Sequence, residues 1–125
     1  MTRVDFDTPD LAKLVEGLSQ DAFDALPFGA IRVDADDQVL RYNQTERRLS
    51  GSGARDRLGR GFFTQVAPCM DNDAFRGRAA QARRAGTLDI EFTHIGDFSD
   101  RDRELTVRLQ SAPENGMWIF IRRED

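Results

Sequence analysis

The sequence predicts an α+β fold in which helices flank one antiparallel sheet of five strands. Two strand patterns lie near the start of the chain and three lie at its end, with a run of helical patterns between them. Strands grouped in this way, instead of alternating one by one with helices, favour an antiparallel sheet. The chain has 125 residues, of which 39% are hydrophobic, so we expect a single globular domain.

Residues 1–26 are predicted to form an N-terminal helical cap on a core of residues 27–125. Apolar residues recur at helical spacing between residues 10 and 17 and predict the first cap helix. Ser19 is a favourable N-cap for a second short helix, which Pro27 would end.

The core is predicted to begin with a hairpin of two strands around a polar turn. Asn43 is a candidate N-cap for the short helix that follows, and Asp73 is the candidate N-cap for a longer helix. Three strands complete the sheet, and the last of them is continuously apolar, as expected of a central strand. The five predicted strands cover residues 28–33, 38–42, 88–93, 105–109 and 117–121, and the longer helix covers residues 74–85.

Charge and composition exclude several kinds of partner. A net charge of −4 argues against binding to nucleic acid or to an anionic membrane. A single cysteine excludes an intramolecular disulfide and a cysteine-rich metal site, so we expect no metal. The start of the chain lacks a signal-peptide pattern, and no apolar run reaches the ~18 residues that span a bilayer, so we expect a cytoplasmic protein. Three arginine pairs are interpreted as solvated: Arg47-Arg48, Arg83-Arg84 and Arg122-Arg123.

Three residues form the candidate site, because together they supply the groups that could attach a small aromatic acid and tune its charge. Cys69, the single cysteine, is a potential nucleophile toward an activated acyl group. Tyr42 supplies a phenol and Glu46 a carboxylic acid, and apolar residues flank all three.

The chain resembles the photoactive yellow protein family, which are blue-light receptors with a PAS fold. The matching positions run nearly without gaps from Leu26 to Asp71 and more loosely to the C-terminus. They include Phe28-Gly29-Ala30-Ile31, Tyr42-Asn43, Glu46, Phe62-Phe63, Val66-Ala67-Pro68-Cys69 and Trp118-Ile119-Phe120.

The resemblance implies a chromophore, 4-hydroxycinnamic acid (p-coumaric acid), bound to Cys69 as a covalent thioester. Tyr42 and Glu46 would donate hydrogen bonds to its phenolate oxygen, and the hydroxyl of Ser50 would support Tyr42. Glu46 must then be protonated at neutral pH, and burial beside a negative ring raises the pKa of a carboxyl group. The family pattern places four apolar residues around the ring: Ile31, Phe62, Val66 and Ala67.

The resemblance also implies a photocycle without a catalytic residue or an enzymatic activity. Light isomerises the chromophore from trans to cis, Glu46 gives up its proton, and an unpaired buried carboxylate remains. Such a charge costs several kcal/mol, against a domain stability of ~5–15 kcal/mol. We expect it to release the cap, residues 1–26, toward a downstream signalling protein whose identity and output, phototaxis or gene regulation, stay open. We expect the protein to be a monomer.

Three positions depart from the family pattern. Ser50 replaces the usual Thr and keeps a hydroxyl group. Ser52 replaces an Arg that often covers the chromophore in the family, and whether Arg55 covers the chromophore instead stays open. The loop over residues 96–103 lacks the apolar residues that the family tends to place there. We therefore expect a pocket that is more open to solvent and a slower return in the dark.

Two other classes of function fit parts of the same sequence. A cysteine enzyme would need a base near Cys69, and His94 is the single candidate, although no Cys-His family signature surrounds either residue. His94 is interpreted instead as a buried sheet residue. A PAS interaction or redox module without a chromophore would signal through oxidation of Cys69. Trp118 and Phe120 are interpreted either as core residues or, if they are exposed on the sheet surface, as a partner site.

Overall fold

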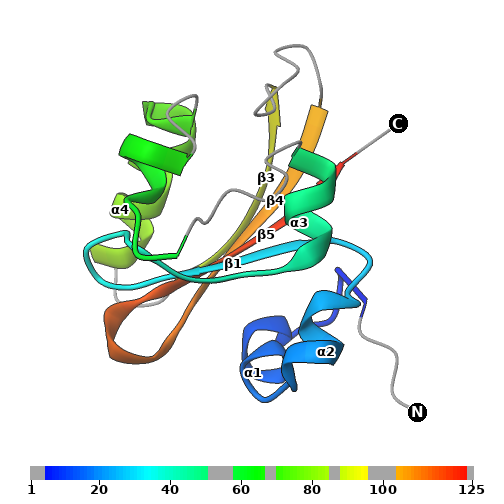
Figure 1. The fold of residues 1–125 in the computed structure, drawn as a ribbon. Helices are drawn as coiled ribbons and strands as arrows, with labels where there is room; N and C mark the ends of the chain where they lie inside the picture. The colour runs from blue at the N-terminus through cyan, green and yellow to red at the C-terminus, as the bar shows by residue number, and fades with distance from the viewer. Residues whose placement is uncertain (1–4, 51–57, 67–69, 85–87, 96–103, 124–125) are drawn as a thin grey trace.

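The computed structural model describes residues 5–50, 58–66, 70–84, 88–95 and 104–123. As predicted, five strands form one antiparallel sheet, and their spatial order is β2-β1-β5-β4-β3 (Figure 1). The continuously apolar run became β5, which lies at the centre of the sheet between β1 and β4. The strands are β1 (Gly29–Val33), β2 (Val39–Tyr42), β3 (Asp89–Ile95), β4 (Glu104–Ser111) and β5 (Met117–Arg123).

Helices cover both faces of the sheet (Figure 1). The cap helices α1 (Leu11–Glu16) and α2 (Gln20–Asp24) lie on one face, and α3 (Gln44–Ser50) and α4 (Arg78–Arg84) lie on the other. Shorter helical turns are η1 (Phe62–Val66), η3 (Asp73–Gly77) and η4 (Pro113–Asn115). In the parts of the chain that the structure describes, no helix is long and apolar enough to cross a membrane.

β5 is buried on both faces, which explains why its sequence is apolar without alternation. Successive side chains of a strand point to opposite faces of the sheet. Ile119 and Ile121 belong to the core cluster that includes Phe62, whereas Trp118 and Phe120 belong to the cluster formed with the cap. Both of these aromatic residues are fully buried, so their placement in the core, one of the two alternatives left open by the sequence, is confirmed.

Two of the three predicted helix caps are confirmed. The Oγ of Ser19 accepts a hydrogen bond from the amide of Ala22 at 3.2 Å, and the start of α3 is capped by Asn43. The third cap was predicted one residue too late, because Asn72 and not Asp73 caps η3. Asn72 has the extended backbone that an N-cap needs, with φ −152° and ψ 171°, and its side chain accepts from the amide of Phe75.

The cap is attached to the sheet by apolar side chains from both of its helices. Leu11 and Val15 of α1 and Phe23 of α2 are fully buried against the same face as Trp118. The attachment is therefore wider than a single helix face.

Polar side chains of the sheet also hold the cap, and they are buried. Arg108 of β4 donates hydrogen bonds to the carbonyl oxygens of Phe6 and Thr8, the second at 2.9 Å. The Oε1 of Gln110 accepts from the amide of Ala12 at 2.7 Å. These contacts reach the cap backbone directly, so they oppose its detachment even where its side chains are small. The division of the chain at residue 26 stays a prediction.

Candidate functional site

The junction of β2 and α3 places Tyr42 and Glu46 in the core. Tyr42 is the last residue of β2 and is 4% exposed, and Glu46 lies in the first turn of α3 and is fully buried. A single residue, Asn43, separates strand from helix, so the two side chains enter the interior close to each other along the chain. A buried carboxyl group needs hydrogen bonds or an opposite charge.

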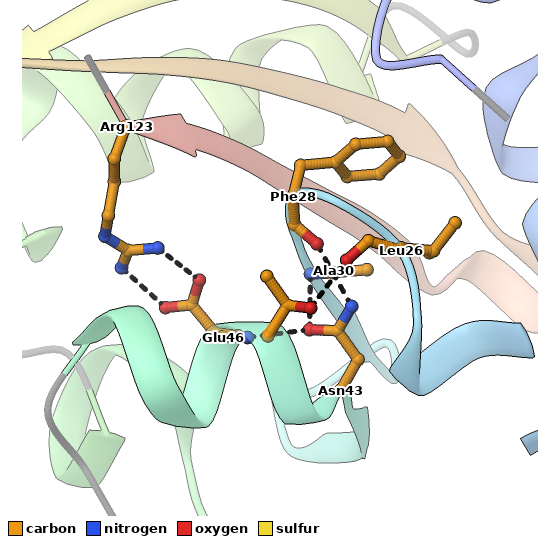
Figure 2. Close-up of polar contacts among 7 residues, drawn as sticks. Leu26, Phe28, Ala30, Asn43, Glu46 and Arg123 are labelled. Carbon is orange, nitrogen blue, oxygen red and sulfur yellow. Dashed lines mark hydrogen bonds and ion pairs between the residues drawn. The ribbon is translucent and has the colours of Figure 1, made fainter. Parts of the chain in front are cut away.

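Asn43 uses its whole side chain to fix this junction. Its Oδ1 accepts hydrogen bonds from the amides of Ala30 and Glu46, both at 3.0 Å. Its Nδ2 donates to the carbonyl oxygens of Phe23 and Phe28, both at 3.1 Å. Figure 2 shows the Asn43 amide between β1 and the start of α3. The helix that carries Glu46 is thus bound to the sheet and to the end of α2.

Two further contacts join the start of α3 to the cap. The hydroxyl of Thr45 donates to the carbonyl oxygen of Leu26 at 2.5 Å, and the carboxylate of Asp24 accepts from the amide of Gln44 at 2.9 Å. Any movement of this turn of α3 therefore acts on the residues that follow α2.

Glu46 forms a buried ion pair that sequence reasoning missed. Arg123 donates from both terminal nitrogens to the two carboxylate oxygens, at 2.7 and 2.8 Å (Figure 2). The side chain of Arg123 is 2% exposed and that of Glu46 is 0% exposed. Paired, parallel hydrogen bonds between a guanidinium and a carboxylate are among the strong polar contacts of proteins.

The interpretation of the Arg122-Arg123 pair as solvated is therefore wrong for Arg123. The two residues point to opposite faces at the end of β5, as the period of a strand requires. Arg122 lies on the cap face, 42% exposed and 3.7 Å from a carboxylate oxygen of Asp7. Arg123 follows the alternation of Ile119 and Ile121 into the core, and this alternation is the signal that could have identified it.

Gly29 makes room for the Glu46 carboxylate. A Cβ added to Gly29 would lie 1.9 Å from Oε1 of Glu46, far inside contact distance. The carboxylate therefore occupies space beside β1 that a larger residue would fill. The guanidinium of Arg123 and the buried phenol of Tyr42 are hydrogen-bond donors, whereas an ionised Glu46 only accepts, so Glu46 would have to be protonated to donate to an anionic ring oxygen.

The structure describes only part of the predicted apolar lining of the chromophore pocket. Ile31, Phe62 and Val66 are buried in the same cluster as Tyr42, so the structure brings these four residues together. Ala67 and Cys69 lie outside the described residues, as do Ser52 and Arg55. Ser50 ends α3, but its side chain is not among those described, so its contact with Tyr42 stays a prediction.

His94 lies in β3 and is buried, on the same face as Phe92. Its ring packs edge-on against Phe75, with 5.6 Å between ring centroids, and burial lowers the pKa of its imidazole. This placement agrees with a buried sheet residue. Within the described ranges, no three side chains of the types that bind metals lie close enough together to hold an ion.

Comparison with known proteins gives a consistent answer, although no family model matches the chain. The chain is 31% identical to the photoactive yellow protein of Halochromatium salexigens, over 98% of this chain and 99% of that protein. It is 42% identical, with a TM-score of 0.79, to the crystal structure of the photoactive yellow protein domain from the sensor histidine kinase Ppr of Rhodospirillum centenum, over 89% and 98% of the two chains.

A PAS domain of an HTR-like protein from Haloarcula marismortui matches with a TM-score of 0.56 at 19% identity, over 84% of this chain and 93% of that one. At this identity the match shows the fold alone, and it agrees with the five-stranded sheet and its flanking helices. The predicted PAS fold is confirmed. The sequence identity over nearly the whole chain and the shared fold show that this chain belongs to the photoactive yellow protein family.

Proposed function

We propose that this chain is a blue-light photoreceptor that carries 4-hydroxycinnamic acid on Cys69 as a thioester. The observation that supports the proposal best is the burial of Tyr42 and Glu46 at the junction of β2 and α3, with Arg123 of β5 paired to Glu46, in a member of this family. When bound, the chromophore would supply blue-light absorption and a trans-to-cis isomerisation.

The protein's own residues would hold the chromophore and control its charge. The hydroxyl of Tyr42 and a protonated Glu46 would donate hydrogen bonds to the ring oxygen, which lowers the free energy of its anionic form. Ile31 and Phe62, both fully buried, would exclude water from the ring. Glu46 would then be the proton donor after illumination.

The signal would pass from Glu46 to the cap through the start of α3. A change of charge on Glu46 would act on the turn that holds Asn43, which accepts from the Glu46 amide, and the adjacent Thr45. The side chains of Asn43 and Thr45 donate to the carbonyl oxygens of Phe23 and Leu26 at the end of the cap. We propose that residues 1–26 detach in the light. Equal hydrogen-exchange protection of α1 in the dark and under blue light would contradict this step.

The attachment itself is tested by incubating the purified protein with activated 4-hydroxycinnamic acid. We expect a mass increase of one 4-hydroxycinnamic acid minus one water, because the activating group leaves with the thiol proton, together with a visible absorption band, and neither in Cys69→Ala. Wild-type protein that gains neither would contradict the photoreceptor proposal and favour the alternative, a PAS interaction or redox module without a chromophore.

The output would pass to another protein. A related domain forms part of a sensor histidine kinase. We therefore propose a signalling protein as the partner and, as for a photoreceptor domain, no enzymatic activity.

A further inference from the structure

We propose that Arg123 is the counter-ion that sets the charge of Glu46. One negative charge would then face the Arg123 guanidinium in the chromophore-free, the dark and the illuminated protein. The proposal starts from the buried ion pair. Both side chains are almost fully enclosed, and both nitrogen–oxygen distances, 2.7 and 2.8 Å, are those of charge-assisted hydrogen bonds.

A guanidinium remains protonated in proteins, so the charge of the pair depends on Glu46 alone. An adjacent positive charge favours the ionised carboxylate, and an isolated buried charge of either sign is strongly unfavourable. In the chromophore-free protein, Glu46 is therefore a carboxylate and Arg123 is its partner. This part of the proposal requires no chromophore.

The second part rests on the proposed function. An anionic ring oxygen beside Glu46 would add a second negative charge to the carboxylate that already faces Arg123, and two like charges at close range disfavour each other. Glu46 would then take up a proton and become the hydrogen-bond donor that the proposed function needs. Arg123 would remain as the counter-ion of the remaining anion.

The same balance holds after illumination. If the carboxyl group of Glu46 gave its proton to the ring oxygen, the negative charge would move to Glu46 and the total charge would be unchanged. The carboxylate is not left unpaired, because Arg123 lies within 2.7 Å of the place where it forms. The expectation of an unpaired buried carboxylate thus changes: Arg123 would stabilise the illuminated state and slow the return in the dark.

Carbon NMR of chromophore-free protein that contains ¹³C-labelled glutamate tests the first part. The side-chain carboxyl signal of Glu46 is assigned by its loss in Glu46→Gln. At neutral pH we expect the signal of an ionised carboxylate in the wild type, in Arg123→Lys and in Arg122→Gln, and the signal of a neutral carboxyl group in Arg123→Gln. Arg122→Gln is the matched control, since it removes the neighbouring arginine from the opposite face.

Two results would overturn the proposal: a neutral Glu46 in the wild type, or an ionised Glu46 in a folded Arg123→Gln protein. If Arg123→Gln does not fold, the wild type and Arg123→Lys still test the proposal, because a neutral Glu46 in either protein would overturn it.

The dark-recovery rate of the chromophore-loaded protein tests the second part. We expect recovery about tenfold faster in Arg123→Gln, which corresponds to ~1.4 kcal/mol, and unchanged recovery in Arg122→Gln.

The two parts can fail separately. If no chromophore attaches, the proposed function fails while the NMR result still decides the role of Arg123. If the chromophore attaches and Arg123→Gln recovers at the wild-type rate, the proposed function stands and the role of Arg123 after illumination is refuted.

Discussion

Arg108→Met should weaken the attachment of the cap more than any exposed substitution on the same face. In the wild type this buried side chain of β4 donates hydrogen bonds to the carbonyl oxygens of Phe6 and Thr8, and a longer one of 3.4 Å to Pro9. Met keeps much of the apolar stem but leaves these oxygens without their donor.

The expected magnitude follows from these contacts. A hydrogen bond to a charged group contributes ~1.5–3 kcal/mol. The contact to Pro9 is long and Thr8 is only half-buried, so water replaces part of what is lost. We expect a loss of ~2–4 kcal/mol in the free energy of cap opening, which is about 30- to 700-fold in the opening equilibrium at ~1.4 kcal/mol per factor of ten.

Native-state hydrogen exchange of the α1 amides measures this quantity. In Arg108→Met we expect these amides to lose protection by that factor while the central strands change less. Arg122→Met is the control, because it contacts Phe6 and Asp7 of the same cap from an exposed position, and its effect should stay below about fivefold. Wild-type protection of α1 in Arg108→Met would refute the conclusion that buried polar contacts hold the cap.

Three other substitutions test the site and its surroundings. Gly29→Ala should destabilise the protein by ~1–3 kcal/mol in denaturant unfolding, because the added Cβ would lie 1.9 Å from Oε1 of Glu46. Gly17→Ala is the control and should not destabilise the protein, because the nearest atom to its added Cβ lies 3.8 Å away. Equal effects of the two substitutions would count against the close approach of Gly29 and Glu46. Thr45→Val removes the hydroxyl that donates to Leu26 and should cost ~1 kcal/mol, seen as faster exchange in α2 than in β3. Burial lowers the pKa of His94, so the folded state binds fewer protons than the unfolded state, and stability should fall as the pH drops below 6.5, the ordinary pKa of a histidine. His94→Phe should flatten that part of the profile, since the chain has one histidine, and an unchanged profile would exclude His94 as its cause.

The parts of the fold that depend on neighbouring residues could be predicted from the sequence. Asn43 precedes a helix whose first turn needs an acceptor, and the structure confirms that its side chain supplies one. The apolar run that begins at Met117 predicted a central strand, and β5 is central. Both features are visible within a few residues of sequence.

Features that depend on distant pairing could not be predicted in the same way. The Arg123–Glu46 ion pair joins residues 77 positions apart, and it depends on the sheet register and on the position of α3. Arg108 alternates with apolar residues and so resembles a solvent-facing position, but the cap covers that face. The alternation along β5 indicated the face on which Arg123 lies but not its partner, and the burial of Arg108 was hidden because its cover comes from another part of the chain.

The measurement that tests the account most directly is the absorption spectrum of the chromophore-loaded protein before, during and after blue illumination. The account predicts a visible band that bleaches in the light and returns fully in the dark, while Cys69→Ala treated identically has no such band. A covalently loaded wild-type protein whose band does not change under blue light would contradict the conclusion that this chain is a photoreceptor.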